Sequence, residues 1–237
     1  MNLTIISITA RALLGRRRVL LLLPMPLVLV GLTLIGVYSG VADADWGPTV
    51  FGNLGLSVIL PLTALIVGSS VLGLEIDDGT ITHLLTKPLP RSEIVLSKLA
   101  VAWVVTTVAT GVPLAVAALL AGSGALAVGL VLAAALGALA YSALFLALSV
   151  LTKRPVAVGL VYIMLWENVL VSFVDGARVF SVREHATTLA DTVGNSPLLS
   201  SSVPLGTAVV MSTLFIVVGT VAATQRLRSF ALTGEAN

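Results

Sequence analysis

The sequence contains no cysteine, and it has few charged or aromatic residues. Of its 237 residues, 10% are charged, 5% are aromatic and 57% are hydrophobic. Without cysteine, the chain can form neither a disulfide nor a thiolate catalytic centre. A soluble protein has about 25% charged and about 45 to 50% apolar residues. With a mean hydropathy of +1.10, this composition excludes an ordinary soluble domain.

Sequence motifs of the common enzyme classes are also missing. The chain has no G-x-x-x-x-G-K-[ST] phosphate loop and no H-E-x-x-H metal motif, so we expect it neither to hydrolyse ATP nor to use zinc. Its two histidines, His83 and His185, fall in opposite predicted loops. No Ser/His or paired-Asp group lies at membrane depth. We therefore expect no catalytic residue, no metal site and no cofactor bound by this chain.

Long apolar runs make up most of the chain. A helix needs about 20 apolar residues to cross about 30 Å of hydrocarbon, and six runs approach or exceed that length. These runs predict an all-α polytopic membrane protein with six transmembrane helices, in which residues 1–237 form a single membrane domain. The expected spans are Val19–Tyr38, Val50–Leu74, Ile94–Leu120, Ala125–Leu151, Pro155–Val174 and Pro204–Thr224.

Basic residues fall almost entirely on one side of these spans. If the spans alternate in direction, only Arg178 and Arg183 lie on the far side. Cytoplasmic loops are enriched in Lys and Arg, so this bias places both termini in the cytoplasm and the protein in the plasma (inner) membrane. We interpret the cations as topology anchors and contacts to membrane lipids. They do not form the aromatic-interleaved basic patch of a nucleic-acid surface.

Two questions about the N-terminal segment stay open: whether it is a cleavable signal peptide, and how its first helix lies relative to the membrane. Arg16 to Arg18, the apolar run after them and Ala42-Asp-Ala44 resemble a cleavable signal peptide, but the run is longer than the usual core of about 7 to 15 residues. Residues 2–15 form an amphipathic stripe with Leu3, Ile6 and Leu13 on its apolar side. Such a helix either lies along the inner interface or extends the first span.

One ionisable residue, Glu167, lies inside a predicted span, directly after Trp166. A carboxylate in hydrocarbon is costly unless it is paired or near water, which makes Glu167 a functional candidate. The alternative is a carboxylate near the outer headgroups that packs against a neighbouring helix. We therefore treat Trp166 and Glu167 as a candidate gate or a packing contact. Small residues spaced by four, such as Gly129, Ala133 and Gly137, indicate close helix packing.

The predicted outer loop, residues 175–203, contains an amphipathic helix. Ser181-Val-Arg-Glu184 is a capping-box pattern, in which Ser181 accepts an early amide proton and Glu184 reaches back. Val182, Ala186, Leu189 and Val193 follow on one face, and Gly194 suits the helix end. Such a helix lies on or dips into the outer leaflet. It is either part of an outer gate or a surface connection.

A polar segment, Glu75–Arg91, separates the second and third spans. Its acidic residues favour a helix N-terminus, Gly79 allows a turn, and Pro88 ends any helical turns before it. Ser92 and Glu93 are then expected to cap the next span, and Lys98 to place its ammonium at headgroup level. Physical reasoning alone leaves two alternatives, a short knob that meets a partner or a solvated connector.

The same segment resembles the first cytoplasmic loop of type-two ATP-binding-cassette (ABC) permeases. The likeness consists of acidic residues, Gly-Thr, an apolar turn, a proline, a basic residue and the later Lys98. His83 replaces the apolar residue that is more usual. The six-span plan, the Trp166-Glu167 pair and the long outer loop extend the likeness over essentially the whole chain. The matching loop residues are Glu75, Asp77, Asp78, Gly79, Thr80, Leu84, Pro88 and Arg91.

The resemblance implies a division of labour between subunits. Residues 75–93 would form a coupling loop that docks in a groove of a separate ABC ATP-binding subunit, which holds ATP and Mg. Residues 1–237 would be one permease domain, or half of a conduit. A second permease chain, in a homodimer or a heterodimer, would supply the other half, and export is the more common direction. The alternatives from other classes are a self-contained secondary transporter or channel, an intramembrane enzyme and a scaffold that has lost transport.

Overall fold

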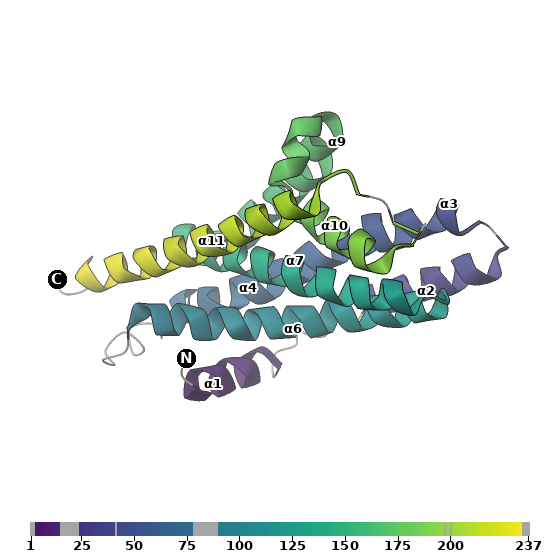
Figure 1. Cartoon of the computed structure of the whole chain (residues 1–237). Helices are drawn as coiled ribbons and strands as arrows, with labels where there is room; N and C mark the ends of the chain where they lie inside the picture. The colour runs from purple at the N-terminus through teal and green to yellow at the C-terminus, as the bar shows by residue number, and fades with distance from the viewer. Residues whose placement is uncertain are drawn as a thin grey trace.

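The computed structural model describes residues 3–14, 24–40, 42–77, 90–196, 198–199 and 201–233. Within these ranges every regular element is a helix (Figure 1), which confirms the all-α class. The elements are α1 (Leu3–Leu14), α2 (Pro24–Tyr38), α3 (Asp43–Gly47), the π-helix η2 (Pro48–Ile59), α4 (Leu60–Asp77), α6 (Arg91–Leu120), α7 (Gly124–Leu151), α8 (Pro155–Val161), the π-helix η3 (Tyr162–Leu170), α9 (Val171–Phe173), the 3-10 helix η4 (Asp175–Phe180), α10 (Val182–Gly194) and α11 (Leu205–Thr233).

Five helical stretches are long and apolar enough to cross a membrane. They are Asp45–Gly73, Arg91–Leu120, Gly124–Leu151, Pro155–Phe173 and Leu205–Ser229, and they correspond to the second through sixth predicted spans. The described part of the first predicted span is α2, with 15 residues, while residues 19–23 lie outside the described ranges. The count of six spans and the cytoplasmic position of both termini therefore remain predictions.

Helix α7 lies at the centre of the bundle and packs against α4, α6, α10 and α11. Small residues along α7, among them Ala133, Ala134 and Ala138, are completely buried. The turn before it is tight because Gly122 adopts a φ of +79°, which L residues with a Cβ rarely adopt. Ser123 then caps α7 by accepting a hydrogen bond from the amide of Leu126 at 3.2 Å. The small side chains let the neighbouring helices approach α7 closely.

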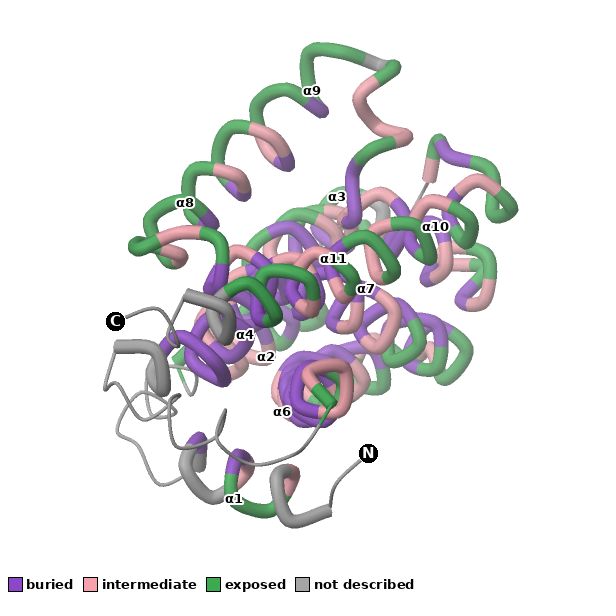
Figure 2. Tube along the Cα trace, turned by 90° about the vertical axis from the view of Figure 1, so that its left-hand side faces the viewer, coloured by how far each residue is buried: buried purple, intermediate pink, exposed green. Residues whose placement is uncertain are grey.

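Two spans at the periphery leave most of their surface uncovered. In the span formed by α8, η3 and α9, 22% of the apolar window is buried, against 67% in α7. Figure 2 shows α8 and α9 standing apart from the other helices, with exposed residues along most of their length. In α11 the buried share is 17%. Apolar side chains on these surfaces are compatible with contact to lipid tails.

Helix α1 lies alongside α6, outside the main bundle (Figure 1). Ile6, Ala10 and Leu13 on its apolar stripe pack into a cluster with residues of α4 and α6, including Val71 and Ala102. The amphipathic helix predicted for this segment is therefore present, and it uses its apolar stripe against protein. The segment that links it to α2, residues 15–23, lies outside the described ranges.

Candidate functional site

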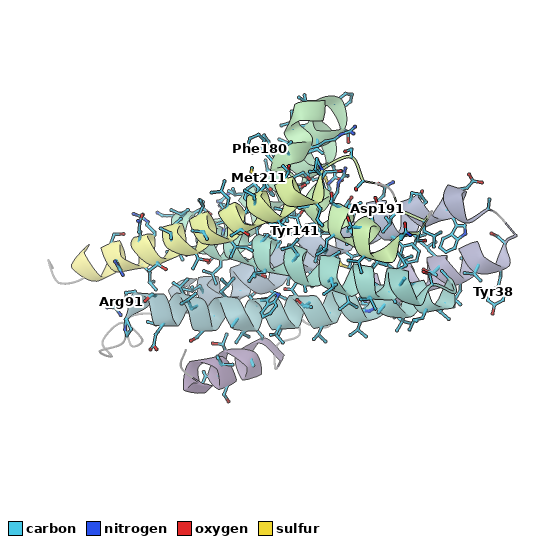
Figure 3. All side chains as sticks on the ribbon, in the orientation of Figure 1. Tyr38, Arg91, Tyr141, Phe180, Asp191 and Met211 are labelled. Atoms are coloured by element: carbon cyan, nitrogen blue, oxygen red, sulfur yellow. The ribbon has the colours of Figure 1, made fainter. Side chains whose placement is uncertain are left out.

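The residues selected from the sequence lie at two separate places. Arg91 is at one end of the bundle in Figure 3, while Phe180, just before α10, and Asp191, in the last turn of α10, lie well away from it. Of the predicted coupling residues, Glu75 and Asp77 belong to the last turns of α4, and Arg91 begins α6. The remaining predicted coupling residues, outside the described ranges, are Asp78, Gly79, Thr80, Leu84 and Pro88.

Helices α4 and α6 pack against each other as a hairpin, and the predicted coupling residues border its ends or lie between its helices in sequence. The N-cap of α6 is Pro90 and provides no side-chain cap. The cap predicted at Ser92 and Glu93 is therefore wrong, because the helix has already begun at Arg91. The amide of Glu93 bonds instead to the carbonyl of Pro90 at 2.9 Å. As an acid in the first turn, Glu93 still favours the positive end of the helix dipole.

Lys98 crosses between the two helices of the hairpin. Its side chain has an exposed fraction of 0%, and Nζ donates a hydrogen bond of 2.8 Å to the carbonyl oxygen of Val71 on α4. Lys98 therefore bonds within the protein and does not contact lipid headgroups, while its position at headgroup level stays a prediction. The cause is local, because α4 passes close enough to offer a backbone acceptor inside the bundle.

Glu167 joins η3 to the beginning of α10. Its carboxylate is completely buried and accepts hydrogen bonds from the Ser181 hydroxyl at 2.5 Å, the Val182 amide at 3.1 Å and the Tyr162 hydroxyl at 3.1 Å. The buried Tyr141 hydroxyl faces the same carboxylate without meeting hydrogen-bond geometry. Three donors thus compensate for the transfer of this group out of water.

The first turn of α10 is capped from two directions. Ser181 is its N-cap and accepts the Glu184 amide at 3.2 Å, as the capping-box pattern predicts. The reciprocal half of the box is absent, because the carboxylate of Glu184 is held by Arg183 at 2.6 Å. The amide of Ser181 bonds instead to the carbonyl of Arg178, and Glu167 accepts the next amide at the helix start, that of Val182. A residue from another span therefore completes the cap.

Trp166 makes a further contact between η3 and the segment before α10. Its half-buried indole Nε1 donates to the carbonyl oxygen of Phe180 at 3.2 Å. Trp166 and Glu167, which are adjacent in sequence, thus both form hydrogen bonds to residues 180–182. The structure brings Trp166, Glu167, Ser181 and Glu184 together around residues 180–181. Figure 3 shows Phe180 well away from Arg91 at the start of α6.

Arg183 links α10 to the other π-helix. Its Nη1 donates to the Ser57 hydroxyl of η2 at 3.1 Å, and its Nη2 binds Glu184. The Ser57 hydroxyl in turn donates to the carbonyl of Gly52, five residues earlier, at 3.1 Å. These side chains line a cavity of about 180 Å³, together with Asn53 and Thr187. Helix α10 therefore has polar contacts to both π-helical segments within its first turn.

Close packing holds the rest of α10 against α7. A Cβ at Gly129 would lie 2.6 Å from the carbonyl oxygen of Ala190 and 3.0 Å from the amide of Gly194. A Cβ at Gly137 would lie 2.7 Å from Leu60 and 3.4 Å from Ala186. The small residues predicted to allow close helix approach thus allow it toward α10. This helix is packed against the bundle core, so it is not a surface connection.

His185 is buried in the middle of this contact. Its Nε2 lies 2.9 Å from the carbonyl oxygen of Val179, and its ring lies 6.3 Å from that of Phe215 in α11. Burial lowers the pKa of His185 below its ordinary value, and the carbonyl of Val179 and the charge of Glu184 oppose that shift. The histidine assigned from sequence to an outer loop is therefore a structural contact of α10.

Several contributors to this site escaped the sequence analysis. Tyr162 lies five residues before Glu167, and such spacing brings side chains together in the wide turns of a π-helix. Ser57 and Arg183 are 126 residues apart, and no local pattern connects them. Among the described residues, no group of three His, Cys, Asp or Glu could hold a metal ion.

These features define a polytopic helical membrane protein with a loop-bearing hairpin at one end and a buried polar contact around α10. A family model described as ABC-2 family transporter protein matches residues 5–175. The match spans more than half of the chain, so the protein belongs to this family of membrane components of ABC transporters. No curated protein matches the sequence.

Proposed function

We propose that this chain is a permease subunit that couples ATP hydrolysis on a separate ABC ATP-binding subunit to substrate transport. Six spans would form half of a conduit, and a second permease chain, identical or related, would form the other half. The observation that supports this best is the ABC-2 family match over residues 5–175, which includes the α4–α6 hairpin and its loop. The absence of a phosphate loop from the 237 residues agrees with ATP hydrolysis on a partner.

In this proposal the loop from Glu75 to Arg91 docks on the ATP-binding subunit. The loop connects directly to two long helices, α4 and α6, which are stiff enough to pass a displacement into the bundle. The hairpin end would face the cytoplasm, where the ATP-binding subunit resides, because the cations gather on that side. Export is the expected direction.

At the opposite end, α10 would act as an outer gate. Its first turn is held by Glu167 of η3 and by Ser57 of η2 through Arg183. Both anchoring segments are π-helical, a geometry that is rare and is frequent at functional sites. Movement of either span would therefore change the contacts that hold α10 in place.

Charge reversal in the loop tests the coupling function. The permease, co-expressed with the ATP-binding subunit encoded by a neighbouring reading frame, would carry Asp77→Lys with Asp78→Lys, or Gly79→Leu. We expect normal membrane insertion, but loss of the ATP-binding subunit on purification and loss of permease-dependent ATPase stimulation. Asp43→Lys with Asp45→Lys on α3, at the other end of the bundle, makes the same charge change as a control.

The alternatives predict different results. Full retention of the ATP-binding subunit and of ATPase stimulation in the loop variants would contradict docking at this loop. Failure of the unmodified permease to retain any ATP-binding subunit after gentle detergent extraction would favour a self-contained transporter or channel.

A further inference from the structure

Lys98 places a charged side chain among apolar side chains inside the α4–α6 hairpin. Lys98 is one of the largest completely buried side chains of the protein. Its neighbours Ile94, Val95 and Leu99 on α6 and Leu72 on α4 belong to an apolar cluster. An ammonium group in such surroundings is costly unless it is compensated. An apolar side chain at residue 98 would avoid this cost, so the lysine is expected to have a role beyond filling space.

One compensating contact of Lys98 joins the two helices that border the loop. Nζ of Lys98 donates to the carbonyl oxygen of Val71 at 2.8 Å, across a sequence separation of 27 residues. Val71 lies less than two turns before the end of α4 at Asp77, and Lys98 lies two turns after the start of α6 at Arg91. The hydrogen bond therefore lies about two turns from the ends of α4 and α6 that border the loop, and it connects these two helices.

Stability alone does not account for this arrangement. Replacing a buried ion pair with apolar residues of similar volume is often neutral or stabilising, and replacing Lys98 with an apolar residue likewise removes the cost of burying its charge and leaves no unpaired charge at Val71, whose partner group is a neutral carbonyl. Methionine is close to lysine in length and adapts readily to core packing. A hairpin selected only for stability would accordingly tolerate methionine at residue 98.

The hairpin is also connected to the candidate gate. Helix α4 continues without interruption from η2, and Ser57 of η2 receives the hydrogen bond of Arg183 from α10. One helical rod therefore extends from the loop to the first turn of α10. Because residues 78–90 join α4 to α6 in sequence, a displacement there acts on both helices, and it passes fully into this rod when α4 and α6 move together.

We propose that Lys98 is a positioning residue for coupling, which fastens α6 to α4 so that the hairpin moves as one body when the loop is displaced. This inference rests on the proposed function, since it assumes that an ATP-binding subunit moves the loop. Lys98 acts through the backbone of α4 and has no role in contacting nucleotide or cargo. Its contribution is to direct loop movement along the rod toward α10.

The test compares Lys98→Met with the unmodified permease, each in complex with the ATP-binding subunit in lipid nanodiscs. Hydrogen–deuterium exchange of residues 181–203 is measured without nucleotide and with ATP plus vanadate, so no cargo needs to be known. Lys153→Met, which removes an exposed lysine after α7, is the matched control. Lys98→Gln, which keeps an uncharged donor, is a second variant that tests rescue of the contact.

We expect the ATP-binding subunit to co-purify with all variants, and the Tm of Lys98→Met to equal or exceed that of the unmodified complex. The nucleotide-dependent change in exchange at residues 181–203 is expected to be lost in Lys98→Met, partly restored in Lys98→Gln and unchanged in Lys153→Met. A full change in Lys98→Met would overturn the inference. A large fall in its Tm would do so too, because it would make the lysine a stability residue. If the unmodified permease retained no ATP-binding subunit, the proposed function itself would fail.

Discussion

Removing the carboxylate of Glu167 gives the sharpest test of how α10 is held. In Glu167→Ala, three donors lose their acceptor: the Ser181 hydroxyl and the Val182 amide, which are buried, and the Tyr162 hydroxyl, which is half-buried. Each orphaned buried donor costs about 1 to 3 kcal/mol, so the Ser181 and Val182 donors together cost about 2 to 6 kcal/mol. Glu167→Gln keeps one oxygen for Val182 and Tyr162, and the Ser181 hydroxyl can turn to accept from the new NH2 group, so its cost should be at most about 1 to 3 kcal/mol.

Two measurements check this prediction. A chain of this length changes Tm by about 2 to 4 °C per kcal/mol, so Glu167→Ala should lower the Tm in detergent by at least about 4 °C, and Glu167→Gln by less. Amide exchange at residues 181–185 should rise in the same order, because these amides lie where the carboxylate caps α10.

The control for Glu167 is its neighbour on η3. Asn168→Ala removes one bond, from Nδ2 to the carbonyl of Ile163 at 2.9 Å, and should cost about 1 kcal/mol without changing exchange at residues 181–185. An equal Tm for Glu167→Ala and the unmodified protein, with unchanged exchange at those amides, would refute the conclusion that Glu167 holds α10.

Two further predictions concern the body of α10. Gly129→Ala should lower the free energy of unfolding by about 1 to 3 kcal/mol through overpacking, because the added methyl would clash with Ala190 and Gly194. Gly31→Ala is the control, since no atom lies within 4 Å of a Cβ there. Equal changes in Tm for the two variants would contradict the close packing of α10 on α7. Burial lowers the pKa of His185 in the folded protein. As the pH falls, His185 therefore becomes protonated in the unfolded state at a higher pH than in the folded state. Stability should therefore decrease from about pH 6.5 toward the lowered pKa. His185→Gln should remove most of that decrease in Tm, and an unaltered pH profile would contradict this role.

Hydropathy predicted the second to sixth spans well, because membrane insertion depends on length and apolarity, which are local properties. The predicted span Ile94–Leu120 became α6, Arg91–Leu120, and the predicted Ala125–Leu151 became α7, Gly124–Leu151. The capping residue Ser181 was predictable for the same reason, since an N-cap depends on neighbours three residues away. The π-helical geometry of η2 and η3 was not predictable, because no local sequence pattern in these segments signals it.

The buried surface of α10 is wider than its apolar face. Val182 and Ala186 of the predicted apolar face are buried and Leu189 and Val193 are half-buried, but the polar residues His185, Thr187 and Thr188 are buried as well. Their hydroxyls and ring bond to nearby carbonyl oxygens, so their burial leaves few polar groups unsatisfied. Hydropathy cannot detect this compensation, which depends on partners brought together by the fold.

The two polar contacts of the η2–α4 rod differ in how easily they can break. At one end Arg183 reaches Ser57 beside a cavity, and a hydrogen bond between helices in a membrane is worth only about 0.6 to 2 kcal/mol. At the other end the ammonium of Lys98 is completely enclosed, and its release from Val71 would disrupt the compensation of a buried charge. The contact near the loop should therefore persist through a transport cycle, while the contact near α10 can open and close. This difference would let the η2–α4 rod transmit movement from the stable Lys98–Val71 contact to the breakable Arg183–Ser57 contact.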